Sequence, residues 1–389
     1  MIEYRLATEQ QKEIAQMARN ILDKELAPRL KELERANDGR GMFPLDVAKT
    51  LAASGLYATD IPEEWGGLGL DLVSTCVMAE EMAKVDAGFA FNFVSAGIYF
   101  PFILRSGLSR EGKQDWADRL LAGEAWGSLC LTEPEAGSDT SAVRTTAVKD
   151  GDEWVLNGRK CFVTGGYQAD HYFVVAWNDK SKSQGKGMTM FLVERDRPGV
   201  SVGGLEDKLG LKLSETCDLV LDDVRVPEDH VIGEVGKGMR ETLSLLHITR
   251  CYVMSFCLGI AQSALDCATQ YAQVRKTWNK PIVDHQGLGF LLADMQIRTE
   301  ASRGMLYYVA SCIKDGQDTG SLTSCVKAFV SDSTMQTTLD AVQVLGGYGY
   351  MKEYPVEKLM RDAKIFQIFD GTNQIQRMLI ARDLAKKEF

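Results

Sequence analysis

Apolar positions in the first third of the chain recur with the period of an amphipathic helix. Thr8 and Gln11 stand at the spacing of a capping box, and apolar residues continue at helical spacing over residues 14–22. Pro44 is suited to open a second helix, because a first turn tolerates its fixed φ and missing N–H. A further helix is expected over residues 72–85. The pattern predicts a helical N-terminal region.

The pattern changes near Trp126, where helical spacing gives way to short runs rich in β-branched and aromatic residues. These runs are Thr145–Val148, Glu153–Leu156, Tyr172–Trp177, Met188–Glu194 and Asp218–Val226. Asp150 and Gly151 lie between the first two runs and are a hairpin signal. Because no helix-length pattern separates the runs, we expect a small antiparallel barrel or sandwich rather than a parallel Rossmann sheet.

The glycines at 233–238 end the β-rich region. A long amphipathic pattern then runs to Gln273, and further helical segments continue to Arg382. The chain therefore reads as α, then β, then α, without an internal repeat. The predicted fold class is α+β and mostly helical.

The composition is that of an acidic globular protein. Of 389 residues, 44 are Lys or Arg and 54 are Asp or Glu, which gives a formal net charge of −10. The chain shows no basic stripe of the kind that binds nucleic acid, so no nucleic-acid partner is expected. An anionic ligand would depend on local basic groups and helix N-termini.

Cysteine and histidine spacing does not suggest a metal site. The nine cysteines include no C-x-x-C pair, and the four histidines are scattered. An odd number of cysteines is typical of buried free thiols in a reducing compartment. The sequence does not begin with a basic start and an apolar run, so a cytoplasmic location is expected.

An uncharged stretch over residues 87–104 approaches the length of a membrane span. Gly88, Asn92, Gly97 and Pro101 interrupt it. We therefore expect a buried helix and turn close to a pocket, and no membrane span.

Four segments carry residues suited to ligand chemistry, and each has an ordinary structural alternative. The loop Leu129–Asp139 could hold an anion or a flavin edge, or be a simple turn. Arg275–Trp278 could bind a diphosphate, or complement a helix dipole. The glycines of Gln343–Tyr350 allow close backbone approach, or end a helix. In the fourth segment, Ile368–Arg377, Asp370 could be a reactive carboxylate, or cap the next helix.

Together these four segments, in this order on an α–β–α chain, resemble the acyl-CoA dehydrogenase family. Lys208–Thr216 and Arg361–Lys364 add to the pattern, and the resemblance covers essentially the whole chain. It implies a helical N-terminal domain (1–121), a central antiparallel β-barrel domain (122–232) and a C-terminal four-helix bundle (233–389). It also implies a homotetramer that binds FAD between the β domain and the C-terminal helices, with a neighbouring subunit completing each site.

The resemblance assigns site residues position by position. The residues that match the family's FAD contacts are Leu129, Leu131, Thr132, Gly137, Ser138, Phe162, Val163, Thr164, Arg275, Thr277, Trp278, Gln286, Gln343, Gly346, Gly347, Thr372 and Gln374. The residues expected to contact the substrate and its CoA arm are Ser138, His247, Arg250 and Gly371. Arg250 has the alternative of a solvated or salt-bridged structural residue. No metal is expected.

Asp370 matches the family's catalytic base. The α-proton beside a thioester is weakly acidic and leaves when hydrogen bonds polarise the carbonyl oxygen, here from the Asp370 N–H and a flavin hydroxyl. A carboxylate in a dry pocket is a stronger base, because burial raises its pKa. The β-hydride leaves for flavin N5.

The sequence departs from the family at this very residue. Most members carry Glu where this chain has Asp370, and the minority position for the base holds Thr249. Aspartate is one methylene shorter, which sets the carboxylate back by about 1.5 Å and disfavours straight-chain substrates. His247 and Lys212 stand where relatives usually have Asp and Arg.

The implied function is oxidation of an acyl-CoA substrate to the 2-enoyl-CoA, with electrons passed to an electron-transferring flavoprotein. The shorter base favours a short, branched or alicyclic acyl group of the cyclohexanecarboxyl type. Six apolar residues between Phe89 and Phe102 are expected to wall its pocket: Phe89, Phe91, Phe93, Ile98, Phe100 and Phe102. The alternatives are an acyl-CoA oxidase, an enoyl-CoA reductase and a non-catalytic FAD-binding interaction protein.

Overall fold

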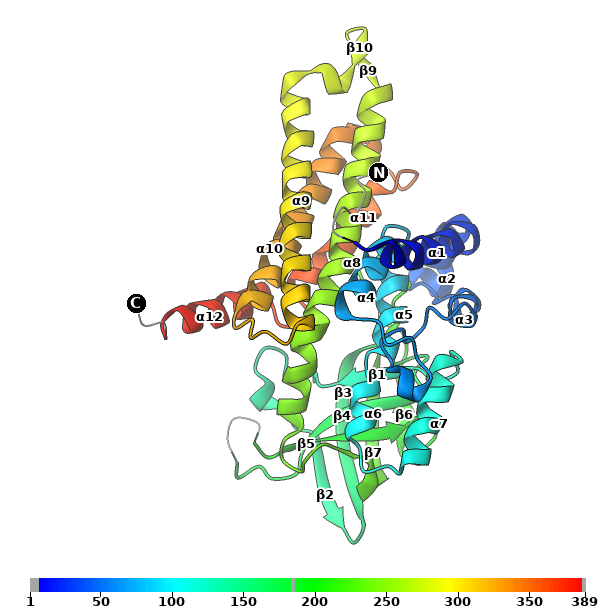
Figure 1. Cartoon of the computed structure of the whole chain (residues 1–389), viewed down its shortest axis with the longest axis vertical. Coiled ribbons are helices and arrows are strands. Elements are labelled where there is room, and N and C mark those ends of the chain that lie inside the picture. The colour runs from blue at the N-terminus through cyan, green and yellow to red at the C-terminus, as the bar shows by residue number, and fades with distance from the viewer. Residues whose placement is uncertain (1–6, 183–185, 387–389) are drawn as a thin grey trace.

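The computed structural model describes residues 7–182 and 186–386, and its N-terminal part is helical (Figure 1). The helices are α1 (Glu9–Glu25), α2 (Leu30–Gly39), α3 (Leu45–Ala53), α4 (Leu72–Ala83), α5 (Ala87–Gly97), α6 (Phe100–Arg105) and α7 (Arg110–Leu121). Thr8 and Gln11 form the predicted reciprocal capping box of α1, and Pro44 is the N-cap of α3. These local sequence signals therefore start their helices as expected.

The central region forms one sheet. Its strands are β1 (Gly127–Cys130), β2 (Thr146–Asp150), β3 (Glu153–Thr164), β4 (His171–Trp177), β5 (Met188–Glu194), β6 (Val200–Val202), β7 (Thr216–Pro227) and β8 (Val231–Ile232). The strand order is β6-β7-β3-β2-β4-β5-β8, with β1 beside β4. The predicted hairpin joins β2 and β3, with Asp150 opposite Glu153.

One sheet prediction was wrong in part, because the pairing is mixed rather than purely antiparallel. Most pairs are antiparallel, but β1 and β2 each pair in parallel with β4. Parallel neighbours need a crossover connection. β1 enters the sheet from the N-terminal helices, and the β2–β3 hairpin supplies the crossover between β1 and β4.

The C-terminal part is a bundle of long helices. It consists of α8 (Gly238–Val274), α9 (Gln286–Lys314), α10 (Leu322–Leu345) and α11 (Val356–Lys364), and α12 (Asn373–Leu384) projects from it. The short pair β9 (Lys276–Thr277) and β10 (Lys280–Pro281) forms the tip between α8 and α9. In Figure 1, α8 runs from the sheet at its N-terminal end to this tip.

A buried ion pair fastens the N-terminal helices to the bundle. Glu80 of α4 is fully buried, and Arg303 of α9 donates to it at 2.9 Å. Tyr307 donates to the other Glu80 oxygen at 2.6 Å. Because a buried carboxylate needs such partners, the position of α4 against α9 is strongly specified.

Two helical stretches are long and apolar enough to cross a membrane by composition alone. They are 87–105 and α8, and most of each apolar window is buried inside the protein. The first consists of α5, a turn and α6, which agrees with the buried helix and turn expected from the sequence. Core helices of globular proteins pass the same test of length and hydropathy.

Candidate active site

Two segments of the sheet lie side by side at one end of the β domain. The Cys161 N–H donates to the Thr132 carbonyl at 2.9 Å, and the Ser128 hydroxyl donates to the Thr164 carbonyl at 2.7 Å. The predicted flavin segments 129–132 and 162–164 are therefore brought together, although β2 separates them in sequence.

Phe162 is held in an unusual conformation within this pair. Its φ is +54°, and the strand register shifts between Lys160 and Val163, as at a bulge. Phe162 is 65% exposed, although Val163 beside it is buried. A left-handed backbone is costly for a bulky residue and concentrates at functional sites. The bulge thus presents an aromatic face outward from the sheet.

A buried ion pair fixes the loop that follows β1. The Lys160 Nζ donates to Glu133 Oε1 at 2.7 Å and to the Leu131 carbonyl at 3.1 Å. Glu133 also accepts from the Thr145 N–H at 3.0 Å. Gly137 and Ser138 lie further along the same loop and are exposed. The base of the loop is therefore rigid, while its tip is open to a ligand.

Asp370 lies on the segment between α11 and α12. The cap of α12 is Thr372, whose hydroxyl accepts from the Ile375 N–H, so the alternative that Asp370 caps this helix does not hold. Asp370 has a φ of +54°. The buried Gln376 donates to the carbonyls of Asp370 and Gly371, at 3.2 and 2.9 Å. The strained backbone at Asp370 is thus clamped from α12.

Burial raises the pKa of Asp370, and the charges of Lys327 and Arg250 partly offset this increase. The two cations come from α10 and α8. Burial lowers the pKa of Lys327 to about 8, although Asp370 acts in the opposite direction. Carboxylates with a raised pKa beside specific charged partners are typical of active sites.

Aromatic contacts join Asp370 to the β domain. The Phe369 ring stacks on Phe91 of α5 with centroids 5.2 Å apart, and Phe91 also meets Phe256 of α8. Tyr99 lies near the Asp370 charge, and its ring centroid is 5.4 Å from that of Phe173 of β4, the residue paired with Leu129 of β1. The carboxylate and the β1 flavin segment therefore belong to one site.

The expectation that the whole aromatic stretch walls this site was wrong. Phe89 and Phe93 stack on each other in the core, and Phe93 also contacts Tyr57. Phe102 contacts Phe173 of the sheet. The helical repeat turns successive aromatic residues to different faces, so among the six residues expected to wall the site, Phe91 is the one whose ring stacks on Phe369, the neighbour of Asp370 in the chain.

Two residues expected at the CoA arm differ in their surroundings. Both ring nitrogens of His247 are engaged, by Thr319 at 2.9 Å and Thr323 at 3.3 Å, which ties α8 to the start of α10. The Arg250 Nε is buried and has no hydrogen-bond partner among the residues that the structure describes. Arg250 as a whole is half-buried, and it lies near the Asp370 charge. Lys212 forms an ion pair with Asp207.

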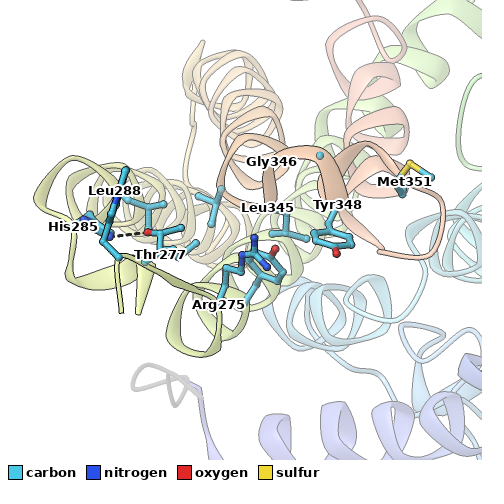
Figure 2. Close-up of a pocket in the computed structure, with 13 residues that line it drawn as sticks. Arg275, Thr277, His285, Leu288, Leu345, Gly346, Tyr348 and Met351 are labelled. Carbon is cyan, nitrogen blue, oxygen red and sulfur yellow. Dashed lines mark hydrogen bonds between the residues drawn. The ribbon is translucent and has the colours of Figure 1, made fainter. Parts of the chain in front are cut away.

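A second site lies at the far end of α8. A pocket of about 610 Å³ lies between the segment after α8 and the end of α10, and Figure 2 shows its lining residues. Of the residues predicted to bind cofactor, it contains Arg275, Thr277, Trp278, Gly346 and Gly347. Gly346 is also the C-cap of α10, so its structural and pocket roles coincide.

Several residues of this pocket were not predicted from the sequence. His285 hydrogen-bonds Thr277 at 2.8 Å, and the Tyr348 ring lies 6.0 Å from the Arg275 guanidinium. In the sequence, the position of His285 directly before a predicted helix is the signal that could have placed it at this pocket. Gln286 and Gln343 are exposed and do not line the pocket. Thr372 and Gln374 lie instead next to Asp370 in the chain.

Comparison with known proteins agrees with this architecture. The chain matches the acyl-CoA dehydrogenase N-terminal domain over residues 8–124, the middle domain over 128–224 and the C-terminal domain over 236–385. A probable acyl-CoA dehydrogenase of Mycobacterium leprae is 41% identical over 380 residues, covering 97% of this chain and 96% of that protein. The chain therefore belongs to the acyl-CoA dehydrogenase family of oxidoreductases.

Two further relatives differ in their named activities. The butyryl-CoA dehydrogenase structure from Megasphaera elsdenii has a TM-score of 0.92 and 37% identity, covering 98% of this chain and 99% of that one. A 3-(aryl)acrylate reductase of Clostridium sporogenes is 36% identical over 381 residues, covering 97% of this chain and 99% of that protein.

Family membership implies a flavin cofactor, and features of this structure fit one. The exposed Phe162 offers an aromatic face at a strained bulge. In the pocket of Figure 2, Arg275 forms no ion pair with any carboxylate in residues 7–182 and 186–386. A Cβ at Gly346 or Gly347 would meet nothing within 4 Å, so the backbone there is open to a ligand. An unpaired arginine beside open backbone suits a phosphate group.

Proposed function

We propose that the chain is an FAD-dependent dehydrogenase that converts an acyl-CoA thioester to its 2-enoyl-CoA, with Asp370 as the catalytic base. The observation that carries this proposal is the Asp370 carboxylate, set on a strained backbone beside the buried Lys327 and the half-buried Arg250. Tyr99, which lies near the Asp370 charge and packs on Phe173 of β4, supports a reaction centre between the carboxylate and the sheet.

The chain's own groups account for the proton transfer. Asp370 accepts the α-proton, and burial strengthens it as a base by disfavouring its charged form. The Asp370 N–H donates to the thioester oxygen and stabilises the charge that develops there. Ser138, Arg250 and Gly371 lie along the thioester and the CoA arm, and His247 shapes this region through Thr319. FAD, when bound, accepts the β-hydride.

Two copies of the chain share each FAD in this proposal. The segments 129–132 and 162–164 take the flavin end, with Thr372 and Gln374 close by. The pocket of Arg275 and Gly346 takes the diphosphate and adenosine end of the FAD bound to a second copy. The Asp370 region faces Arg250 in the first half of α8, whereas the pocket begins at Arg275, just after the helix ends, so the 25 residues between them place the two regions about 38 Å apart along the helix. One chain therefore holds the two halves too far apart for a single cofactor.

A homotetramer extends this arrangement. Large apolar side chains are exposed on the bundle helices, including Phe290, Ile297 and Tyr308 of α9 and Phe329 of α10. Exposed apolar surface of this kind is typical of subunit interfaces. One contact between two subunits completes the cofactor sites, and a second contact, between the resulting dimers, covers the exposed apolar faces of the bundles.

Replacing Arg275 by Ala should weaken FAD retention, because the diphosphate loses its charged partner. The native protein should be yellow, with one FAD per chain. The Asp370→Asn variant should keep its FAD but lack activity.

Co-expression of the two differently tagged variants should restore activity in purified mixed oligomers, because one site then combines Arg275 of one chain with Asp370 of the other. If each site were built within one chain, the mixed oligomers would stay inactive.

The substrate proposed here is a short, branched or alicyclic acyl-CoA. Asp370 is shorter than the usual glutamate, and the stacked Phe91 and Phe369 rings limit the space beside it. Anaerobic bleaching of the bound flavin by butyryl-, cyclohexanecarboxyl- and octanoyl-CoA tests both the reaction and the acyl group. An FAD-loaded protein that none of these bleaches would be a non-catalytic member of the family.

The direction of the reaction has a second candidate. The relative named 3-(aryl)acrylate reductase favours reduction of an unsaturated acyl group by the same residues. In that direction, Asp370 donates the α-proton. Mixing the chemically reduced protein with the matching enoyl-CoA tests it by the return of the oxidised flavin spectrum.

Electrons are proposed to leave through an electron-transferring flavoprotein. Oxygen consumption with acyl-CoA alone would instead identify an oxidase. The nine cysteines are all free in the structure, which supports a reducing, cytoplasmic location.

A further inference from the structure

Lys327 is a buried lysine that the reaction described above does not use. It lies on α10, and its side chain is completely buried. Lysine is rarely buried in this way, because removing the ammonium group from water is costly without a charged or hydrogen-bonded partner. The residues that contact Lys327 therefore indicate the role of its charge.

The hydrogen bonds of Lys327 lead directly to the segment that carries Asp370. Its Nζ donates to Asn373 Oδ1 at 2.9 Å, and Asn373 is the first residue of α12, three positions after Asp370. The Asn373 amide also donates to Ser331 at 2.9 Å and to Asp332 at 2.7 Å. The ammonium is thus fixed against the base segment by a neutral partner, which leaves its charge uncompensated there.

The adjacent carboxylate Asp332 is already neutralised by other residues. Arg377 forms an ion pair with it at 2.6 Å, and Gln367 donates to its other oxygen at 2.6 Å. Gln367 and Asn373 stand on either side of Asp370, so Asp332 serves as an anchor for both ends of the base segment. The charge of Lys327 is therefore available to Asp370.

The charged and titratable groups that face Asp370 come from three elements. They are Lys327 of α10, Arg250 of α8 and Tyr99 between α5 and α6. Lys327 itself also faces Cys257 and Arg250 of α8 and Asp332 of its own helix. In this cluster, the two cations oppose the effect of burial on a single carboxylate.

We propose that Lys327 is a positioning residue: its buried ammonium group, together with the Arg250 guanidinium, keeps the Asp370 carboxylate ionised at the candidate active site. A carboxylate buried without such cations would hold its proton at neutral pH and could not accept another. This inference rests on the proposed role of Asp370 as the base. Hydrogen bonding to Asn373 fixes the position of the ammonium, and its charge sets the state of the base.

The test compares pH profiles of kcat/KM in the FAD-loaded enzyme. Lys327→Met removes the charge, and Lys327→Gln removes the charge but keeps an amide that can donate to Asn373. In both variants the acid limb should move to higher pH by about one unit, because an opposite charge close to an aspartate lowers its pKa by roughly one to three units. Activity at pH values below the new limb should fall about tenfold against the native enzyme.

Ser331→Ala is the matched control. It removes a hydrogen bond to Asn373 without changing any charge, so its acid limb should stay at the native pH even if kcat changes. Thermal unfolding of each variant adds a second readout. Loss of Lys327 should leave the midpoint unchanged or raised, since a buried charge is costly to the fold.

Each outcome decides between the possible roles. An unchanged acid limb in Lys327→Met and Lys327→Gln overturns the inference. An equal shift of the acid limb in Ser331→Ala also overturns it, because the effect would then come from the hydrogen bonds of Asn373 and not from the charge of Lys327. A lowered midpoint with a native pH profile would identify a structural lysine. Full activity in Asp370→Asn would instead overturn the role of Asp370, independently of Lys327.

Discussion

Replacing Asp370 by Asn should reduce kcat/KM for acyl-CoA oxidation about a hundredfold to ten-thousandfold. Positioned general bases contribute roughly a hundredfold to ten-thousandfold, and an amide cannot accept the α-proton. Asn matches Asp in size, so the stacking of Phe369 on Phe91 and the Gln376 clamp should remain. Activity is measured anaerobically by the rate of flavin bleaching, and the FAD content reports whether the fold is intact.

The native enzyme should lose activity on the acid side above the usual range of an aspartate. Burial raises the pKa of Asp370, and only the ionised carboxylate accepts a proton, so kcat/KM should fall as pH drops through the raised pKa. Asp115→Asn on α7, an exposed position, is the matched control and should keep the native profile. A residual acid limb shared by native enzyme and Asp370→Asn would show that the base lies elsewhere.

The elements that the sequence predicted well are those with local signals. The capping box of α1 and the β2–β3 hairpin each depend on residues within a few positions of one another. The parallel pairing of β1 with β4 depends on how the N-terminal helices deliver β1 to the sheet. Periodicity within a strand carries no information about its partner, so this pairing could not be predicted.

The same distinction holds at the candidate site. Asp370 and Arg275 were identified by short motifs, whereas Lys327 and Gln376 were not. Lys327 lies on α10, whereas its hydrogen-bond partner Asn373 lies on α12. A single lysine within an apolar sequence pattern does not indicate which distant residue it contacts. Gln376 is found within the motif itself, but its role follows from the positive φ of Asp370, which the sequence alone does not reveal.

The aromatic stretch that forms α5 and α6 illustrates a further limit. An uncharged, phenylalanine-rich segment near a pocket predicted a broad aromatic wall. The stretch is helical, so its rings are distributed between the core around Tyr57, the sheet and the site. Composition located the segment, but the helical phase decided that Phe91 is the ring placed against Phe369.

Asp370→Glu should change which acyl groups the enzyme prefers. The positive φ and the Gln376 clamp hold the Asp370 backbone in place, so the longer side chain advances the carboxylate by about 1.5 Å. A displacement of this size can alter a rate on the order of a hundredfold. Straight-chain substrates such as butyryl-CoA should therefore react as well as or better than with the native enzyme, whereas cyclohexanecarboxyl-CoA should be crowded and react more slowly.

The physical basis is the position of the α-proton. A ring or a branch at the α-carbon brings a tertiary proton closer to a base that is set back, and the Phe91–Phe369 stack leaves the carboxylate no lateral room to compensate. The measurement is kcat/KM for cyclohexanecarboxyl-CoA and for straight chains of several lengths in the native protein, Asp370→Glu and the surface control Asp115→Glu. If the native enzyme preferred octanoyl-CoA, and Asp370→Glu improved kcat/KM equally for every substrate, the aspartate would have no relation to substrate shape and this prediction would be wrong.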